Sequence, residues 1–315
     1  MKKLFFVSFV LILLTLLLYI MIPNKISINE TLTINANHEA AYRTLTNLDS
    51  WHKWWPGNEK VNNPNKSSAH FSFNGNIYSI NDKMSYSLVI GIDTKQFTAK
   101  TIFNIFPFTR DSIKLNWMVD IPVSYNPIKR VQEYLTAKKI ENDINKILKI
   151  IASFISKDEN IYGIAVTQKP VIDSILVSTF DNSKGYPSTQ YIYNLISELK
   201  IYIANNGAKE TGFPMLNIFT KDSTNYLTRV AIPVDKKLNN HGNISYKGML
   251  GGGKILIAEV KGDSKKVNIA MKQMEDYLRD HHYVAPAIPF LSLVTDRTKE
   301  KDSSKWITRI YCPIM

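Results

Sequence analysis

The chain has 315 residues, a length typical of two domains, and 44% of them are hydrophobic, which excludes an intrinsically disordered protein. Its single cysteine excludes an internal disulfide bond. The net charge is +12, but no run of five basic residues occurs, whereas a nucleic-acid-binding surface gathers its positive charge in one place. We therefore expect a folded protein with a diffusely basic surface and no nucleic-acid partner.

The first element expected is an apolar helix over residues 4–22, which contain no charged side chain. Such a helix would be about 28 Å long, close to the thickness of a bilayer's hydrocarbon core. A cleaved signal peptide is the alternative, but the small-x-small cleavage site is missing from the Met-Ile-Pro-Asn-Lys sequence at 21–25. Lys2 and Lys3 favour a cytoplasmic N-terminus, although Lys25 on the far side weakens that orientation. We predict that residues 1–25 are a single-pass membrane anchor with the rest of the chain extracytoplasmic.

Residues 26–157 are predicted to form an α+β domain. A β-rich start is followed by a helix that Asn37 can cap, and then by several strand-like runs. Asn74-Gly75 is a strong signal for a tight hairpin between two of these runs. A long amphipathic helix closes the domain near Ser156. Its apolar face consists of Ile140, Ile144, Ile147, Leu148, Ile151 and Ile155.

This order of elements, with the Trp-His-Lys-Trp-Trp-Pro turn at 51–56 after the first helix, resembles the helix-grip fold of the SRPBCC (START-like, polyketide-cyclase-like) superfamily. The resemblance implies a curved antiparallel sheet wrapped around the long helix, with an elongated apolar cavity for lipids, sterols or polyketides. Trp51, Trp55 and Trp117 are the residues expected to line it. The alternative is that these tryptophans only fill the core between helix and sheet.

Residues 160–315 contain an internal repeat. The sequence of residues 226–233, Tyr-Leu-Thr-Arg-Val-Ala-Ile-Pro, reappears 80 residues later as Trp-Ile-Thr-Arg-Ile-Tyr-Cys-Pro at 306–313, and the same offset relates residues 175–177 to 255–257. Each copy predicts a strand, a helix capped by a serine (Ser188 or Ser264) and two further strands. Two such β-α-β-β units would pair around a pseudo-twofold axis and enclose a cleft, a common setting for a ligand site.

This half of the chain resembles the GyrI-like (effector-binding, SOUL-like) domains. The matching features are Gly-Phe-Pro at 212–214, Val-Ala-Ile-Pro-Val at 230–234, Gly-Gly-Lys at 252–254 and the final Trp-x-Thr-x-Ile-x-x-Pro motif. The resemblance implies binding of amphipathic small molecules in the central cleft, and some members of the family are assigned as hydrolases. Phe213, Glu259, Trp306 and Tyr311 are the cleft residues that it points to.

The sequence departs from the GyrI-like pattern at its acidic positions. Members that bind cations place a glutamate on the strand corresponding to 289–294, which here reads Pro-Phe-Leu-Ser-Leu-Val. The acid often found after the repeated threonine is replaced by Arg229 and Arg309. A cationic ligand would therefore lose its main partner, because a buried charge needs an opposite charge. We expect both arginines to lie on the solvent-exposed face of their strands.

The sequence contains no convincing catalytic or metal-binding set. His281 and His282 are adjacent and have no third ligand at metal spacing, and Cys312 has no nearby histidine in sequence. Glu259, on a cleft-forming strand, is the one acid that could act as a base. No cofactor and no metal are expected.

We therefore predict an α+β protein with an N-terminal transmembrane helix (1–25), a helix-grip antiparallel-sheet domain (26–157) and a duplicated β-α-β-β, GyrI-like domain (160–315). The leading hypothesis is a membrane-anchored protein that binds apolar or amphipathic small molecules without catalysis. One alternative is a hydrolase of small hydrophobic compounds that uses Glu259. Another is an interaction protein whose cavities are filled.

Overall fold

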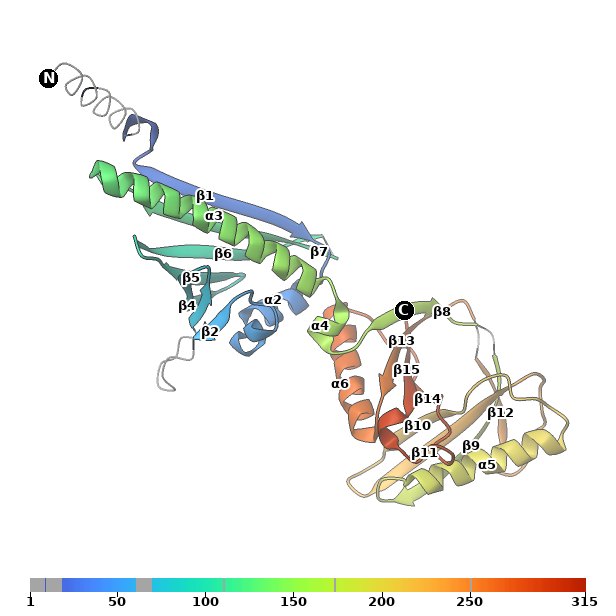
Figure 1. Cartoon of the computed structure of the whole chain (residues 1–315). Helices are drawn as coiled ribbons and strands as arrows, with labels where there is room; N and C mark the ends of the chain where they lie inside the picture. Colours follow the sequence, from blue (N-terminus) through green and yellow to red (C-terminus); the bar gives the residue numbers. More distant parts are fainter. Residues whose placement is uncertain (1–8, 10–18, 61–69, 110, 173, 250) are drawn as a thin grey trace. The chain divides into compact units, whose positions relative to one another are not determined.

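The computed structural model describes the chain except for residues 1–8, 10–18, 61–69, 110, 173 and 250 (Figure 1). The chain divides into two compact units, residues 1–157 and residues 158–315. Each unit is α+β and has an antiparallel sheet of its own, so each is described by itself.

The predicted transmembrane helix is corrected by the structure. Among the residues that the structure describes, no helix is both long enough and apolar enough to cross a membrane. Most of the expected helix at 4–22 lies outside the described residues, which at this end are Phe9 and residue 19 onward. The structure therefore does not support the predicted transmembrane helix or the predicted single-pass membrane localisation.

The first unit is a seven-stranded antiparallel sheet with one long helix against it (Figure 1). The strands lie in the order β1-β7-β6-β5-β4-β3-β2, so each is next to its neighbour in sequence except at β1, which pairs with β7. The elements are β1 (Lys25–Ile34), α2 (His38–Thr46), η1 (Leu48–Lys53), β2 (Asn58–Lys60), β3 (His70–Phe73), β4 (Asn76–Met84), β5 (Ser87–Asp93), β6 (Thr98–Thr109), β7 (Ser112–Pro122) and α3 (Pro127–Ile155).

Local signals explain where these elements begin and end. The side chain of Asn37 accepts a hydrogen bond from the backbone N–H of Ala40 and caps α2. Asn126 caps α3 in the same way, and Pro127 follows at the first helical position, where its missing N–H costs nothing. Asn74 and Gly75 join β3 to β4 with positive φ angles of 49° and 83°, as the predicted hairpin requires. The predicted apolar face of α3 is buried.

The second unit has an eight-stranded antiparallel sheet, in the order β12-β9-β11-β10-β14-β15-β13-β8. Helices α5 and α6 pack against the strands of the first and second half of that sheet, respectively. The elements are α4 (Asp158–Tyr162), β8 (Val166–Pro170), β9 (Ser174–Lys184), α5 (Thr189–Asn205), β10 (Met215–Thr220), β11 (Asn225–Val234), β12 (Ser245–Met249), β13 (Lys254–Lys261), α6 (Ser264–Asp280), β14 (Phe290–Leu293), η2 (Ser303–Lys305) and β15 (Ile307–Ile314).

The sheet has the arrangement expected of a duplicated β-α-β-β unit. In the first copy β11 lies between β9 and β10, and in the second copy β15 lies between β13 and β14. The copies meet where β10 pairs with β14, and Leu216 lies opposite Leu291 at that junction. The edge strands β12 and β8 extend the sheet on each side. The pairing between copies is symmetric, as a pseudo-twofold axis requires.

The offset of 80 residues holds for the repeated segments 226–233 and 306–313 but not for the first strand of each copy. Pro233 pairs with Leu176, whereas Pro313 pairs with Ile255, so β9 and β13 correspond at an offset of 79. Burial agrees, because Val177 and Leu256 are both buried at 1% exposure. The predicted match of 175–177 to 255–257 is wrong by one residue, and in a strand one residue turns every side chain to the opposite face.

Candidate ligand cavity in the second unit

A cavity of about 630 Å³ lies against the sheet of the second unit. Strand alternation explains which residues reach it. Val177, Leu216 and Val230 belong to the hydrophobic core that packs with α5 on the other face, although Leu216 and Val230 also border the cavity. Their neighbours Leu176, Met215 and Ala231 line the cavity. The face of the sheet opposite α5 therefore supplies the floor.

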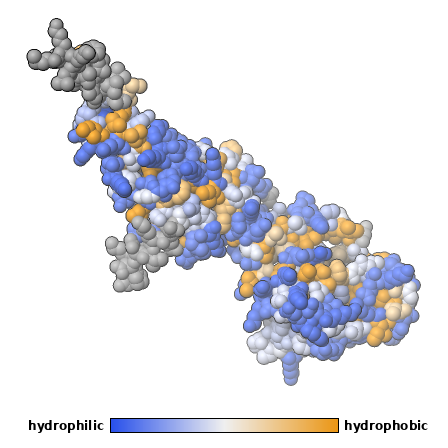
Figure 2. Space-filling model, viewed as in Figure 1, coloured by the Kyte–Doolittle hydropathy of each residue, from blue (hydrophilic) through white to orange (hydrophobic). Residues whose placement is uncertain are grey.

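The walls of the cavity are mainly apolar and come from both copies of the repeat. The second copy contributes Phe290, Pro313 and Met315. The first copy contributes Met215 on β10, and the edge strand β12 contributes Met249. Pro286, Ala287 and Ile288 form part of the rim, and Ile288 is 57% exposed. In Figure 2 hydrophobic residues reach the visible surface at several places. An apolar cavity with few polar groups is typical of small-molecule sites.

Three basic residues are among those that line this cavity: Arg229 on β11, Lys247 on β12 and Lys254 at the start of β13. The two lysines are exposed, whereas Arg229 is half-buried. Arg229 donates from Nη1 to Oδ1 of Asn217 at 3.1 Å, and Asn217 in turn donates from Nδ2 to the carbonyl of Pro289 at 3.0 Å. The guanidinium of Arg229 is therefore held at the floor of the cavity by the side-chain amide of Asn217, which is itself hydrogen-bonded to Pro289. Arg229 lies on the sheet face away from the α5 core and is half-buried in the cavity there.

The four cleft residues predicted for this unit occupy different settings. Tyr311 stacks on the cavity residue Phe290, with ring centroids 5.1 Å apart and planes 1° apart. Oε2 of Glu259 accepts a hydrogen bond from Nε of Arg309 at 2.9 Å. Trp306 lies under the guanidinium of Arg297 at 4.7 Å, and its Nε1 donates to the carbonyl of Glu300. These three residues are not among those that line the large cavity.

Phe213, the fourth predicted residue, lines a smaller cavity of about 270 Å³ in the second unit. This cavity lies beside α5 and includes Tyr193, Lys200 and Asp296. The hydroxyl of Tyr193 donates to the carbonyl of Thr295 and accepts from the backbone N–H of Arg297. Burial raises the pKa of Tyr193, which keeps its hydroxyl protonated at neutral pH.

Trp51, Trp55 and Trp117, predicted to line a cavity in the first unit, lie in its aromatic core. They are 1%, 7% and 1% exposed. Trp51 stacks on Trp55 at 5.3 Å, and each indole N–H has a partner: the carbonyl of Leu45 for Trp51, the carbonyl of Ser72 for Trp55 and the hydroxyl of Thr101 for Trp117. Rings that are buried, stacked and hydrogen-bonded in this way stabilise the packing of the sheet against its helices.

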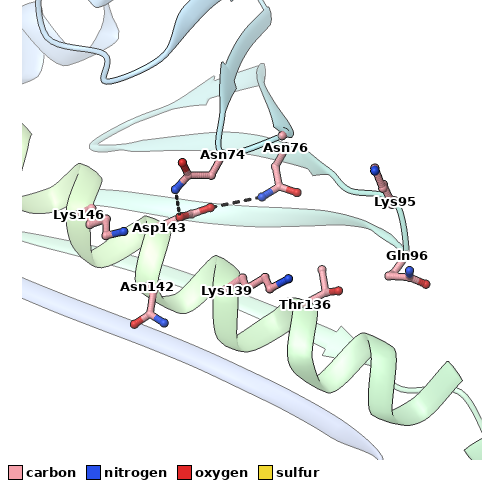
Figure 3. A pocket seen from close by; sticks show the side chains of 10 residues that line it. Asn74, Asn76, Lys95, Gln96, Thr136, Lys139, Asn142, Asp143 and Lys146 are labelled. Carbon is pink, nitrogen blue, oxygen red and sulfur yellow. Dashed lines mark hydrogen bonds between the residues drawn. The ribbon is translucent and has the colours of Figure 1, made fainter. Parts of the chain in front are cut away.

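The first unit also carries a polar cavity of about 550 Å³ between α3, the β3–β4 hairpin and the β5–β6 turn (Figure 3). Its central group is Asp143, which is 3% exposed. Asp143 accepts hydrogen bonds from the side-chain amides of Asn74 at 2.7 Å and Asn76 at 3.3 Å, as the dashed lines show. The carboxylate therefore attaches the hairpin to the helix. Lys95, Lys139 and Lys146 also line this cavity and are exposed.

Asp143 also affects the buried Tyr78. Burial raises the pKa of the Tyr78 phenol far above its ordinary value, and the negative charge of Asp143 raises it further. Tyr78 is 0% exposed, and no described residue forms a hydrogen bond with its hydroxyl. The phenol therefore stays neutral at every ordinary pH.

The residues singled out in the sequence for metal binding or nucleophilic chemistry occupy the following settings. No group of three or more histidine, cysteine, aspartate or glutamate residues there could hold a metal ion. Cys312 is 1% exposed, and burial raises its pKa to about 11, which disfavours the nucleophilic thiolate. Stacking on Tyr277 at 4.0 Å holds His281 against α6.

Asn217 and Met215 are site residues that sequence reasoning missed. Alternation along β11 places Arg229 and Ala231 on one face, opposite the buried Val230, but it does not by itself reach β10. The antiparallel register then brings Asn217 opposite Arg229 and Met215 opposite Ala231. The register itself is not readable from the residues.

No family model and no curated protein matches the chain. Solved structures do match. The EcmrR–DNA complex is 18% identical, covers 61% of this chain and 72% of its own, and has a TM-score of 0.44. A hydrolase from Listeria innocua is 7% identical over 48% of this chain and 91% of its own, with a TM-score of 0.35. SAV2435, bound to tetraphenylphosphonium, is 14% identical over 48% and 93%, with a TM-score of 0.32. Likeness at this level assigns no activity to this chain.

Proposed function

We propose that the second unit binds small apolar or amphipathic molecules in the cavity on its sheet. The observation that carries this proposal is the cavity of about 630 Å³, with Leu176, Met215, Ala231 and Phe290 among its apolar lining residues. The duplicated β-α-β-β topology supports it, because the GyrI-like domains that residues 160–315 resemble bind such molecules in their central cleft.

The size of the cavity suits a ligand of two or three rings or an alkyl chain of similar bulk. Burying about 200 Å² of apolar ligand surface contributes roughly 5 kcal/mol at about 25 cal/mol per Å². Part of this gain is offset by the lost freedom of the ligand and of the side chains that it orders. We therefore expect dissociation constants of about 0.2 mM or weaker for ligands without charge.

Titration of the full chain with the neutral dye N-phenyl-1-naphthylamine tests the proposal. We expect saturable fluorescence enhancement with a stoichiometry near one. Ala231→Phe, which places a ring in the cavity, should weaken binding by about tenfold or more because the added volume has no room to relax. Ile269→Phe is the matched control, since Ile269 is 56% exposed on α6 and does not line the cavity. Equal dye binding by wild type and Ala231→Phe would contradict the proposal.

The two alternatives receive less support from the geometry. A hydrolase that uses Glu259 would need that carboxylate free at the cavity, but it accepts from Arg309 and does not line the large cavity. An interaction protein with filled cavities does not fit the second unit, whose cavity is open, and the first unit combines a filled aromatic core with a polar cavity of about 550 Å³. A ligand role for the first unit, its SRPBCC resemblance and the absence of a nucleic-acid partner stay predictions.

A further inference from the structure

We propose that the cavity of the second unit selects ligands that carry one anionic group, a carboxylate or a sulfonate, on an apolar body, and that Arg229 is the residue that binds this group. The inference rests on the proposed function, because it names the chemical class of the ligand in the same cavity. It is carried by the contrast between two arginines that the repeat places at equivalent positions.

Arg229 and Arg309 occupy equivalent positions in the repeated segments 226–233 and 306–313. Arg309 lies opposite Glu259 in the β13–β15 register, and the two side chains form an ion pair with Nε and Oε2 at 2.9 Å. Arg229 lies opposite Phe180 in the β9–β11 register. Because β9 and β13 correspond at an offset of 79, Phe180 occupies the position of Glu259. The first copy therefore has the cation without the acid that neutralises it in the second copy.

Arg229 is nevertheless held in a defined orientation. Among the described residues, Nη1 of Arg229 donates a hydrogen bond to Oδ1 of Asn217. The amide of Asn217 is itself fixed because its Nδ2 donates to the carbonyl of Pro289. Asn217 is neutral, so the positive charge remains uncompensated by this partner. A guanidinium presents five N–H donors in a planar fork that matches a carboxylate or sulfonate. Most of these donors remain available for a ligand, and their direction is set before binding.

The charge of the rest of the lining has the same sign. Lys247 and Lys254 also line the cavity, and none of its described lining residues is an aspartate or a glutamate. Both lysines are exposed, so solvent screens them and they attract an anion more weakly than a half-buried arginine does. Among the described lining residues, a cationic ligand would meet three basic residues and no aspartate or glutamate side chain. Discrimination between an anion and a cation of the same shape follows from this arrangement.

A pair of dyes with the same apolar body separates the charge from the apolar contribution. 1-Anilinonaphthalene-8-sulfonate carries the rings of N-phenyl-1-naphthylamine and adds one sulfonate. For the full chain we expect the anionic dye to bind at least about tenfold tighter than the neutral one, the scale of a charge-assisted hydrogen bond. Arg229→Gln should lose this preference, with the affinity for the neutral dye unchanged within about twofold.

Arg309→Gln is the matched control. It removes one positive charge from the equivalent position of the same sheet, but from an arginine already paired with Glu259. We expect it to keep the preference for the anionic dye. Competition with decanoate, decanol and decyltrimethylammonium repeats the comparison without dyes: decanoate should displace the neutral dye best and the ammonium compound worst. Near-ultraviolet circular dichroism of each variant verifies that it is folded.

The outcomes separate the two proposals. If the neutral dye does not bind, the proposed function fails. If it binds but the anionic dye binds no tighter, or if decyltrimethylammonium competes as well as decanoate, the charge selectivity alone is refuted. A preference lost in Lys247→Gln or Lys254→Gln but kept in Arg229→Gln would overturn the role of Arg229.

Discussion

Cys312 illustrates how burial alone determines the chemistry of a side chain. It is the single cysteine of the chain and lies in β15, with 1% of its surface exposed. Burial raises its pKa from an ordinary value of 9.0 to about 11, and the nearby negative charge of Glu275 acts in the same direction. The side chain therefore behaves as a small apolar residue of the core.

The raised pKa of Cys312 predicts a specific loss of stability in alkaline solution. The folded state prefers the protonated thiol, so this contribution is complete below pH 9 and is lost as the pH rises toward about 11. The loss should reach about 2–3 kcal/mol in the free energy of unfolding. Urea titrations at pH 8 and pH 11 should show this extra loss in the wild type and not in Cys312→Val. The same pH dependence in both proteins would contradict the assignment.

At the scale of elements, helix starts depend on which side chain reaches the free backbone N–H groups. Ser188 caps α5 as predicted, with its hydroxyl accepting from the N–H of Tyr191 at 3.2 Å. Ser264 was expected to cap α6, but it is the first helical residue. The cap is Asp263, whose carboxylate accepts from the N–H of Lys266 at 3.0 Å. An acidic cap also interacts favourably with the positive end of the helix dipole.

This correction predicts different effects for two adjacent substitutions. Asp263→Ala removes the cap of α6 and should lower the free energy of unfolding by about 1 kcal/mol, within a range of roughly 0.5–2 kcal/mol. Ser264→Ala should change it by less than about 0.5 kcal/mol, because alanine is a good helix former and the cap remains. Thermal or urea unfolding of both variants measures the difference. A larger effect of Ser264→Ala would restore the serine as the cap.

At the scale of the whole molecule, the chain consists of two units that each have their own sheet and their own core. The first core is aromatic and contains Trp51 and Trp117 packed between the sheet and its helices. In the second unit α5 covers one half of the sheet and α6 the other. Separate cores are what allow segments of a chain to fold on their own.

We therefore expect residues 158–315 expressed alone to unfold cooperatively in urea. They should also bind N-phenyl-1-naphthylamine with an affinity within about twofold of the full chain, since every described residue that lines the cavity belongs to this segment. Isothermal titration of both proteins makes the comparison. A folded segment that does not bind the dye, beside a full chain that does, would place the binding site elsewhere.

The sequence by itself determined the α+β class, the duplicated β-α-β-β order, the hairpin at Asn74-Gly75 and the apolar face of α3, because each depends on residues close together in the chain. Only the tertiary structure decided what the site contains. Strand register is set by packing across the sheet. Because β9 and β13 correspond at an offset of 79 and not 80 residues, Phe180 lies opposite Arg229 where Glu259 lies opposite Arg309. Packing within the first unit buries its three tryptophans. In the second unit the cavity lies on the face of the sheet opposite α5. The lining of a cavity depends on long-range pairing, which local patterns do not contain.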